Sequence, residues 1–121
     1  IAGGDVGTGA IEAIKEAGKY GIGVDRDQSD LAPENVLTSA IKRVDAGIFE
    51  TVKAFVEGNF EGGTSITYGL EEDAVGIPET TKNLVPQDII DYVNEEIQKL
   101  KSGEITVPKT EEQYNEFIKN L

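Results

Sequence analysis

The sequence predicts an α/β fold in which a parallel sheet is flanked by helices. Short apolar runs alternate with helical patterns in the order strand, helix, strand, strand, helix, strand, which is the signature of parallel βαβ units. The length of 121 residues corresponds to one domain or to a piece of one. With 38% hydrophobic and 28% charged residues, the composition is typical of a globular chain.

The first half of the chain carries the clearest pattern. Residues 1–4 read as the end of a buried strand entering a glycine turn, so we expect the chain to be the later portion of a longer protein. A helix is predicted at 7–17, with Ile11 and Ile14 on one face and Gly18 ending it. The elements predicted next are a buried strand at 20–24, a polar loop at 25–34 and a second strand at 36–41.

The second half is predicted to add two longer helices, one further strand and a short terminal helix. The first long helix, at 44–57, has its apolar residues at the spacing of a core-facing stripe: Ile48, Val52, Phe55 and Val56. The later elements are a strand at 64–70, an irregular stretch at 71–85, an amphipathic helix at 86–100 starting at Pro86, a short extended piece around 105–107 and a final helix from Thr110.

The residue inventory removes several functional classes. The chain has no Cys and no His, so it holds neither Ser-His-Asp nor Cys-His machinery and no ordinary structural zinc site. Eleven Lys and Arg against 23 Asp and Glu give a net charge of −12, which disfavours nucleic acid and anionic membrane surfaces. No apolar run reaches the roughly 18 residues of a membrane helix. We expect no metal and no cofactor. We also expect no enzymatic activity, since no spacing marks a catalytic pair of carboxylates.

Ligands of parallel α/β sheets bind beyond the carboxyl ends of the strands, and three loops are predicted at that edge. The first, from Gly3 to Gly9, either offers backbone N–H groups to a polar ligand or is a tight turn that needs positive φ. It matches neither the dinucleotide-binding G-x-G-x-x-G pattern nor a P-loop.

Two charged residues mark the other loops. Asp25 stands at the carboxyl end of a strand, where its carboxylate either accepts hydrogen bonds from adjacent hydroxyls of a sugar or caps the loop. Lys42 follows the next strand and reaches the same edge, where it either donates to a ligand, pairs with an acid or is simply solvated. The residues alone leave these alternatives open.

An ordered set of short motifs resembles the basic membrane protein family, the nucleoside-binding lipoproteins of bacterial ABC transporters. The resemblance covers residues 1 to about 109 and is specific in its order and spacing. Its motifs are Ala2-Gly3-Gly4, Gly7-Thr8-Gly9, Ala17-Gly18-Lys19-Tyr20, Ile22-Gly23-Val24-Asp25, Asp27-Gln28, Val36-Leu37-Thr38-Ser39, Lys42-Arg43-Val44-Asp45, Gly58-Asn59-Phe60-Glu61-Gly62-Gly63, Ser102-Gly103-Glu104-Ile105 and Val107-Pro108.

The resemblance implies a type I periplasmic-binding-protein fold, in which two α/β lobes close over a ligand. Residues 1–75 would then be part of the carboxyl-side lobe, and residues 76–121 a returning helical segment. The resemblance further implies ligand binding by the backbone of Gly3 and Gly4, by Asp25 through ribose hydroxyls, and by Lys42. The family stacks its purine between aromatic rings, and the matching positions lie outside this segment.

The function that the resemblance implies is binding of purine nucleosides for uptake, without catalysis. The implied partners are the permease subunits of an ABC transporter and the amino-side lobe of the same protein. The implied location is extracytoplasmic, either as a cell-envelope lipoprotein held by a lipid anchor outside this segment or in the periplasm. Three alternatives stay open: the ligand-sensing domain of a transcription regulator with the same fold, a transport protein that binds a sugar, and a nucleoside- or sugar-processing enzyme, for which the inventory offers no obvious base or nucleophile.

Overall fold

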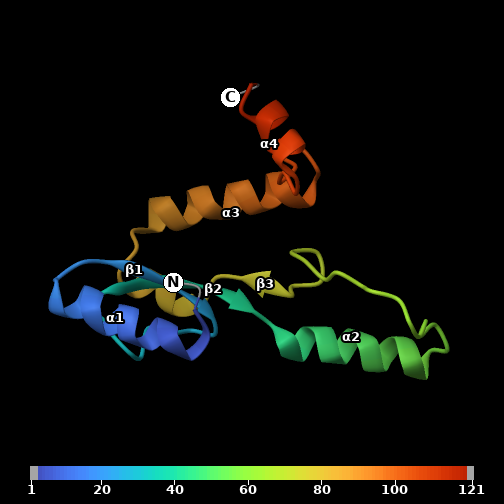
Figure 1. Cartoon of the computed structure of the whole chain (residues 1–121), viewed down its shortest axis with the longest axis horizontal. Coiled ribbons are helices and arrows are strands. Elements are labelled where there is room, and N and C mark those ends of the chain that lie inside the picture. Colours follow the sequence, from blue (N-terminus) through green and yellow to red (C-terminus); the bar gives the residue numbers. More distant parts are fainter. Residues whose placement is uncertain (1–2, 120–121) are drawn as a thin grey trace. The chain divides into compact units, whose positions relative to one another are not determined.

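The computed structural model describes residues 3–119 and has two compact units, Ile1–Ile90 and Asp91–Leu121 (Figure 1). The elements follow one another as 3₁₀ helix η1 (Gly4–Val6), α1 (Gly7–Glu16), β1 (Gly21–Asp25), β2 (Val36–Lys42), α2 (Val44–Val56), β3 (Val75–Gly76), 3₁₀ helix η2 (Glu79–Asn83), α3 (Gln87–Lys101) and α4 (Glu111–Phe117).

The sheet has the strand order β1-β2-β3 and is built around a parallel pair. β1 and β2 run parallel, as the sequence predicts, and the register places Gly23 opposite Ser39 and Asp25 opposite Ile41. β3 pairs antiparallel with the last residues of β2, so that Lys42 lies opposite Val75. The carboxyl ends of β1 and β2 therefore meet at one edge of the sheet.

The prediction of a strand at residues 64–70 is wrong. That segment has no regular structure, and the chain instead turns at Gly69, whose N–H donates to Glu72 Oε2 at 2.7 Å. A strand requires a hydrogen-bonded neighbour. The edge of β2 is paired at its carboxyl end by β3, which falls within a stretch that the sequence pattern marks as irregular.

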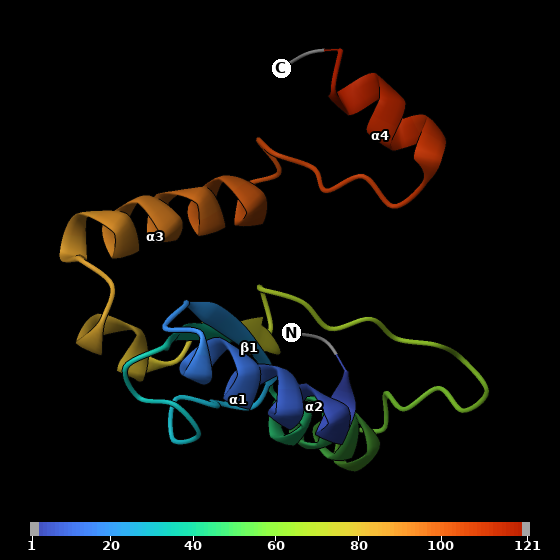
Figure 2. The same ribbon diagram turned by 60° about the vertical axis from the view of Figure 1, so that its left-hand side comes forward.

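Helix α1 lies alongside β1 in both views of the molecule (Figures 1 and 2) and supplies the centre of a small core. Its Ile11 is 1% exposed and packs with Ala32, Val36 and the partly buried Leu31. The helix ends as predicted at Gly18, which has φ of 59°. The N–H groups of Gly18 and Lys19 donate to the carbonyls of Lys15 and Ile14, which is the Schellman pattern.

Helix α2 forms within one residue of its predicted bounds, but its apolar stripe is not part of a core. None of its residues is buried, and Ile48, Val52 and Phe55 are 60%, 56% and 71% exposed. Helical spacing shows which residues share a face, whereas burial depends on what packs against that face. The expectation that these positions are core residues is therefore not met among the described residues.

The later helices follow the sequence pattern more closely. α3 begins directly after Pro86, and α4 is capped by Thr110, whose hydroxyl accepts from the Gln113 N–H at 3.2 Å. No strand forms around residues 105–107, so the short extended piece expected there does not pair. None of the described helices is long and apolar enough to cross a membrane. The division of the chain into lobe segments 1–75 and 76–121 stays a prediction.

Candidate binding site at the carboxyl ends of the strands

The edge of the sheet brings Asp25 and Lys42 together. Each is the last residue of its strand, and because Asp25 lies opposite Ile41, Lys42 is one residue further along the same edge. Lys42 Nζ and Asp25 Oδ1 are 2.8 Å apart. The side chains are 62% and 51% exposed, and ion pairs this exposed contribute only about 0–1 kcal/mol to folding. The pair is thus open to a ligand.

The backbone at Asp25 has an unusual conformation. Its φ is 70°, in the left-handed region that a residue with a side chain seldom adopts. The N–H of Arg26 donates to the carbonyl of Val24 at 2.9 Å, so three residues form the hydrogen bond of a γ-turn centred on Asp25. A residue held this way costs about 1–3 kcal/mol, and such residues cluster at functional sites. The turn ends β1 abruptly and presents the Asp25 carboxylate at the edge.

A buried polar cluster lies behind this turn. The Gln28 side chain is 7% exposed and its Oε1 accepts from the Val24 N–H at 2.9 Å. The Gln28 N–H donates in turn to Oγ of Ser39, a fully buried residue of β2, at 3.1 Å. Gly23 leaves the room for both, because a Cβ there would stand 2.5 Å from Ser39 Oγ and 2.8 Å from Gln28 Oε1. The end of β1 is thus fastened to β2 through hydrogen bonds.

Asp27 ties the same loop to a distant part of the chain. Its Oδ1 accepts from the Ser29 N–H at 3.0 Å, and its Oδ2 accepts from the Thr80 hydroxyl at 2.7 Å. Burial raises the pKa of Asp27, but the hydrogen bonds from Ser29 and Thr80, together with the charge of Arg26, hold this pKa below its ordinary value. Asp27 is therefore a charged acceptor that organises the loop beside Asp25.

A second hydroxyl contact fastens η2 to the sheet. The hydroxyls of Thr38 in β2 and Thr81 in η2 are 2.6 Å apart, and Thr81 is 5% exposed. Together, the bond from Thr80 to Asp27 and this contact hold η2 against the loop that follows β1 and against β2.

The glycine turn at Gly3 and Gly4 contains the positive φ that a tight turn needs. Gly4 has φ of 54° and begins η1, so a tight turn with positive φ is present. A Cβ at Gly3 would stand 3.4 Å from the N atom of Gly7. Among the described residues, no hydrogen bond or ion pair joins Gly3 or Gly4 to Asp25 or Lys42. Ligand contact by the backbone of this turn stays a prediction.

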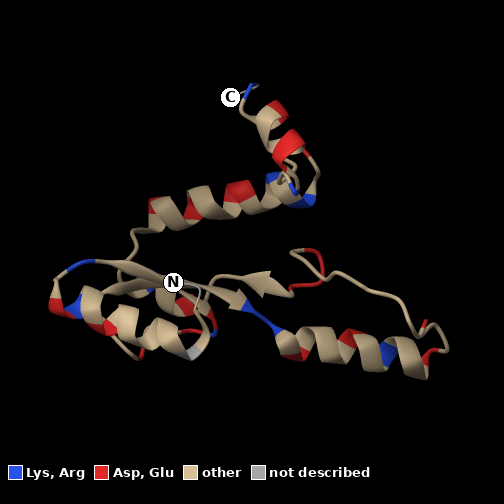
Figure 3. Cartoon of the chain, viewed as in Figure 1, with Lys and Arg blue, Asp and Glu red and all other residues tan. Residues whose placement is uncertain are grey.

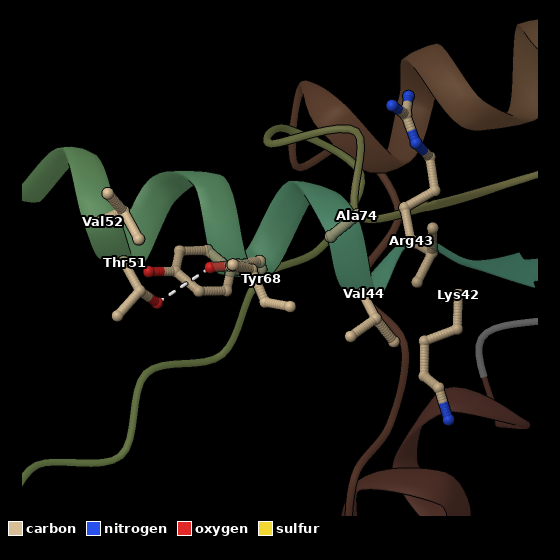
Figure 4. Close-up of a pocket in the computed structure, with 10 residues that line it drawn as sticks. Lys42, Arg43, Val44, Thr51, Val52, Tyr68 and Ala74 are labelled. Atoms are coloured by element: carbon tan, nitrogen blue, oxygen red, sulfur yellow. Dashed lines mark hydrogen bonds between the residues drawn. The ribbon is translucent and has the colours of Figure 1, made fainter.

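A groove adjoins the basic residues that link β2 to α2, which Figure 3 shows as a blue connection. Its volume is about 550 Å³. Tyr68 lies against α2 beside Thr51, whose hydroxyl donates to the Gly47 carbonyl, and the Lys42 ammonium points away from that ring (Figure 4). The lining residues are Lys42, Arg43, Val44, Gly47, Ile48, Thr51, Val52, Tyr68, Ala74 and Val75.

Several residues that form hydrogen bonds around Asp25 are not identified by the sequence pattern. Thr80 and Thr81 are common polar residues, and nothing in their spacing shows that they are buried or bonded. Gln28 and Ser39 carry a weak signal, because each stands in one of the motifs of the family resemblance. No group of three or more acidic residues suited to a metal ion occurs in the part of the chain that the structure describes.

Comparison with known families defines the class. Residues 1–111 match the family model described as ABC transporter substrate-binding protein, PnrA-like. The chain therefore belongs to this family of substrate-binding proteins, as its motifs indicate.

Its relatives are similar over nearly the whole chain. It is 41% identical over 116 residues to Basic membrane protein A2 of Borrelia garinii subsp. bavariensis, which covers 93% of this chain and 34% of that protein. It is 40% identical over 118 residues to Basic membrane protein A of Borreliella afzelii. This match covers 95% of this chain and 36% of that protein. The chain thus spans about a third of the length of these curated relatives.

Two solved structures share the fold. A transcriptional activator of the comK gene from Bacillus halodurans superposes with a TM-score of 0.69 at 30% identity, over 77% of this chain and 32% of that one. An ABC transporter solute-binding protein from Aeropyrum pernix superposes with a TM-score of 0.66 at 26% identity. The superposition covers 92% of this chain and 40% of that one. Together with the helix-flanked sheet, the second likeness confirms the predicted fold class, a partial lobe of a periplasmic-binding-protein fold.

Proposed function

We propose that this chain is part of an extracytoplasmic solute-binding protein that captures purine nucleosides for an ABC transporter. The observation that carries the proposal is the exposed pair of Asp25 and Lys42 at the carboxyl ends of two parallel strands. In sheets of this kind, that edge is where ligands bind. Membership of the substrate-binding family supports the transport role.

The pair suits the hydroxyls of a ribose. Oδ1 of Asp25 is engaged by Lys42, and Oδ2 accepts no hydrogen bond from the described residues, so it is available to a ligand hydroxyl. The ammonium group of Lys42 has three donors and uses one on Asp25, which leaves donors for ligand oxygens. Because the two charges balance, the pair favours a neutral polyol over an anion. The Gly3–Gly4 turn is the proposed backbone contact.

The remaining parts of the proposal concern the longer protein. The second lobe supplies the aromatic surfaces that stack on the purine base and, on closure, excludes water from the site. The proposed partners of the closed protein are the permease subunits of the transporter. We place the protein outside the cytoplasm, either held by a lipid anchor outside this segment or in the periplasm.

The test identifies the ligand and the residue that holds it. The full-length protein is purified without added ligand and denatured, and the released small molecules are identified by mass spectrometry. A stoichiometric purine nucleoside is expected, whereas a sugar would overturn the nucleoside assignment. If the purified protein carries no ligand, the native protein is titrated by calorimetry with adenosine, guanosine and inosine. Failure to bind any of the three contradicts the proposal.

A pair of variants tests the role of Asp25. Asp25→Asn removes the charge that accepts from hydroxyls, and hydrogen bonds to a charged group contribute enough that affinity is expected to fall at least about tenfold. The matched control is Asp30→Asn, which alters an exposed carboxylate of the same loop whose partner is Arg26. Equal affinities of the two variants would remove Asp25 from the site.

A second candidate is the ligand-sensing part of a transcription regulator. The likeness to the transcriptional activator from Bacillus halodurans favours it, because the same fold occurs there in a protein of that class. A helix-turn-helix segment in the full-length gene product supports this candidate, and a lipoprotein leader supports transport.

A further inference from the structure

The buried side chain of Gln28 has a specific structural task. It is 7% exposed, and a polar group buried to this degree requires hydrogen-bond partners. The side-chain Oε1 accepts from the Val24 N–H at 2.9 Å, while the backbone N–H of Gln28 donates to Ser39 Oγ at 3.1 Å. Gln28 therefore connects the end of β1 to the interior of β2.

These bonds act on the residue next to Asp25. The N–H of Val24 is held by Gln28, and its carbonyl is held by the Arg26 N–H at 2.9 Å. Both backbone polar groups of Val24 are thus fixed immediately before the left-handed residue Asp25, whose φ is 70°. A strained conformation persists only where its surroundings hold it. The Gln28 bond is the side-chain contact that does so here.

The surroundings of Gln28 are closely packed. Ser39 is fully buried, and no Cβ fits at Gly23 between Ser39 and Gln28. By contrast, the pair formed by Asp25 and Lys42 is exposed and contributes little of its own to hold the turn. The geometry of the pair therefore depends on the buried contact behind it.

We propose that Gln28 is a positioning residue of the ligand site, which holds the γ-turn so that the Asp25 carboxylate faces Lys42 and a ligand hydroxyl. This role rests on the proposed function. Gln28 is buried and acts on the ligand through Asp25. Its effect on affinity therefore depends on whether residue 25 carries a carboxylate.

A double-mutant cycle in the full-length protein tests this dependence. Guanosine, inosine and adenosine are titrated by calorimetry against the unmutated protein, Gln28→Leu, Asp25→Asn and the double variant. Gln28→Leu is expected to weaken binding about tenfold when Asp25 is present and less than twofold in the Asp25→Asn background. Ile11→Val, which perturbs the core away from the turn, serves as the control and is expected to leave affinity unchanged.

A conservative variant guards against misfolding of Gln28→Leu. Gln28→Met is uncharged and has the same side-chain length, but it offers no oxygen acceptor to the Val24 N–H, so it is expected to show the same loss of affinity as Gln28→Leu. The same loss for Gln28→Leu in both backgrounds, or an affinity of Gln28→Met equal to that of the unmutated protein, overturns the positioning role alone. Failure of the unmutated protein to bind any of the three nucleosides overturns the proposed function, and the positioning role with it.

Discussion

Gly23→Ala is the substitution whose consequence follows most directly from the geometry. The added Cβ would stand 2.5 Å from Ser39 Oγ, 2.8 Å from Gln28 Oε1 and 3.0 Å from Gln28 Cβ. Real Cβ atoms do not approach other atoms this closely. Ser39 is fully buried and lies opposite Gly23 in the parallel ladder, so the clash can be relieved only by moving the strands or the buried side chains.

The magnitude comes from three contributions. Overpacking of a filled interior costs about 1–3 kcal/mol. Displacing Ser39 Oγ leaves the buried N–H of Gln28 without its acceptor, which costs about 1–3 kcal/mol more. Against these, replacing glycine by alanine inside a strand restores about 0.5–1 kcal/mol of backbone entropy. We therefore expect the free energy of unfolding to fall by about 1–5 kcal/mol, with a central value of about 3 kcal/mol.

The assay is urea unfolding of the protein, with Gly47→Ala as the matched control. A Cβ at Gly47, inside α2, would meet Tyr68 Cδ2 at 3.7 Å, an ordinary contact. The same chemical change is expected there to stabilise the helix by up to about 1 kcal/mol. With slopes of about 1–3 kcal/mol per molar urea, a loss of about 3 kcal/mol lowers the Gly23→Ala midpoint by about 1–3 M.

The refuting result is clear. If Gly23→Ala unfolds at the same urea concentration as the unmutated protein, the packing of Gly23 against Ser39 and Gln28 is not as described. The positioning role of Gln28 would then lose its structural basis. A shift in urea midpoint equal to that of Gly47→Ala would lead to the same conclusion.

Two further predictions concern stability. The depressed pKa of Asp27 means that its charged form is stabilised by folding, so its contribution is present above the unfolded pKa of about 3.9 and is lost as the pH falls through the folded pKa. The free energy of unfolding of the unmutated protein and of Asp27→Asn is measured at pH 6 and at pH 3. The difference between the two proteins is expected to be smaller at pH 3, and an equal difference at both pH values contradicts the prediction. Gly18→Ala places a side chain at φ of 59° at the end of α1 and is expected to cost about 1 kcal/mol, measured by thermal unfolding, whereas Gly9→Ala within the same helix, where a Cβ meets open space, should not destabilise.

The sequence by itself determines the local elements and the family. The bounds of α1, with Gly18 in its left-handed cap, and the start of α3 after Pro86 follow from hydrogen bonds and dihedral preferences within a few residues. The parallel pair of β1 and β2, and the placing of Asp25 and Lys42 at one edge, follow from the direction of consecutive strands. These features are encoded locally, so pattern and spacing reveal them.

The tertiary structure alone decides the pairing of β3, the burial of side chains and the contacts that support the site. β3 pairs with β2 at residues 75–76 rather than at 64–70, because strand pairing is settled by contacts between distant segments. The apolar stripe of α2 has the spacing of a core helix but no covering partner among the described residues. The γ-turn at Asp25 and its bond network through Gln28 depend on Ser39, eleven residues further along the chain. No local pattern encodes such a contact, because the energy of a buried hydrogen bond depends on where folding brings both partners.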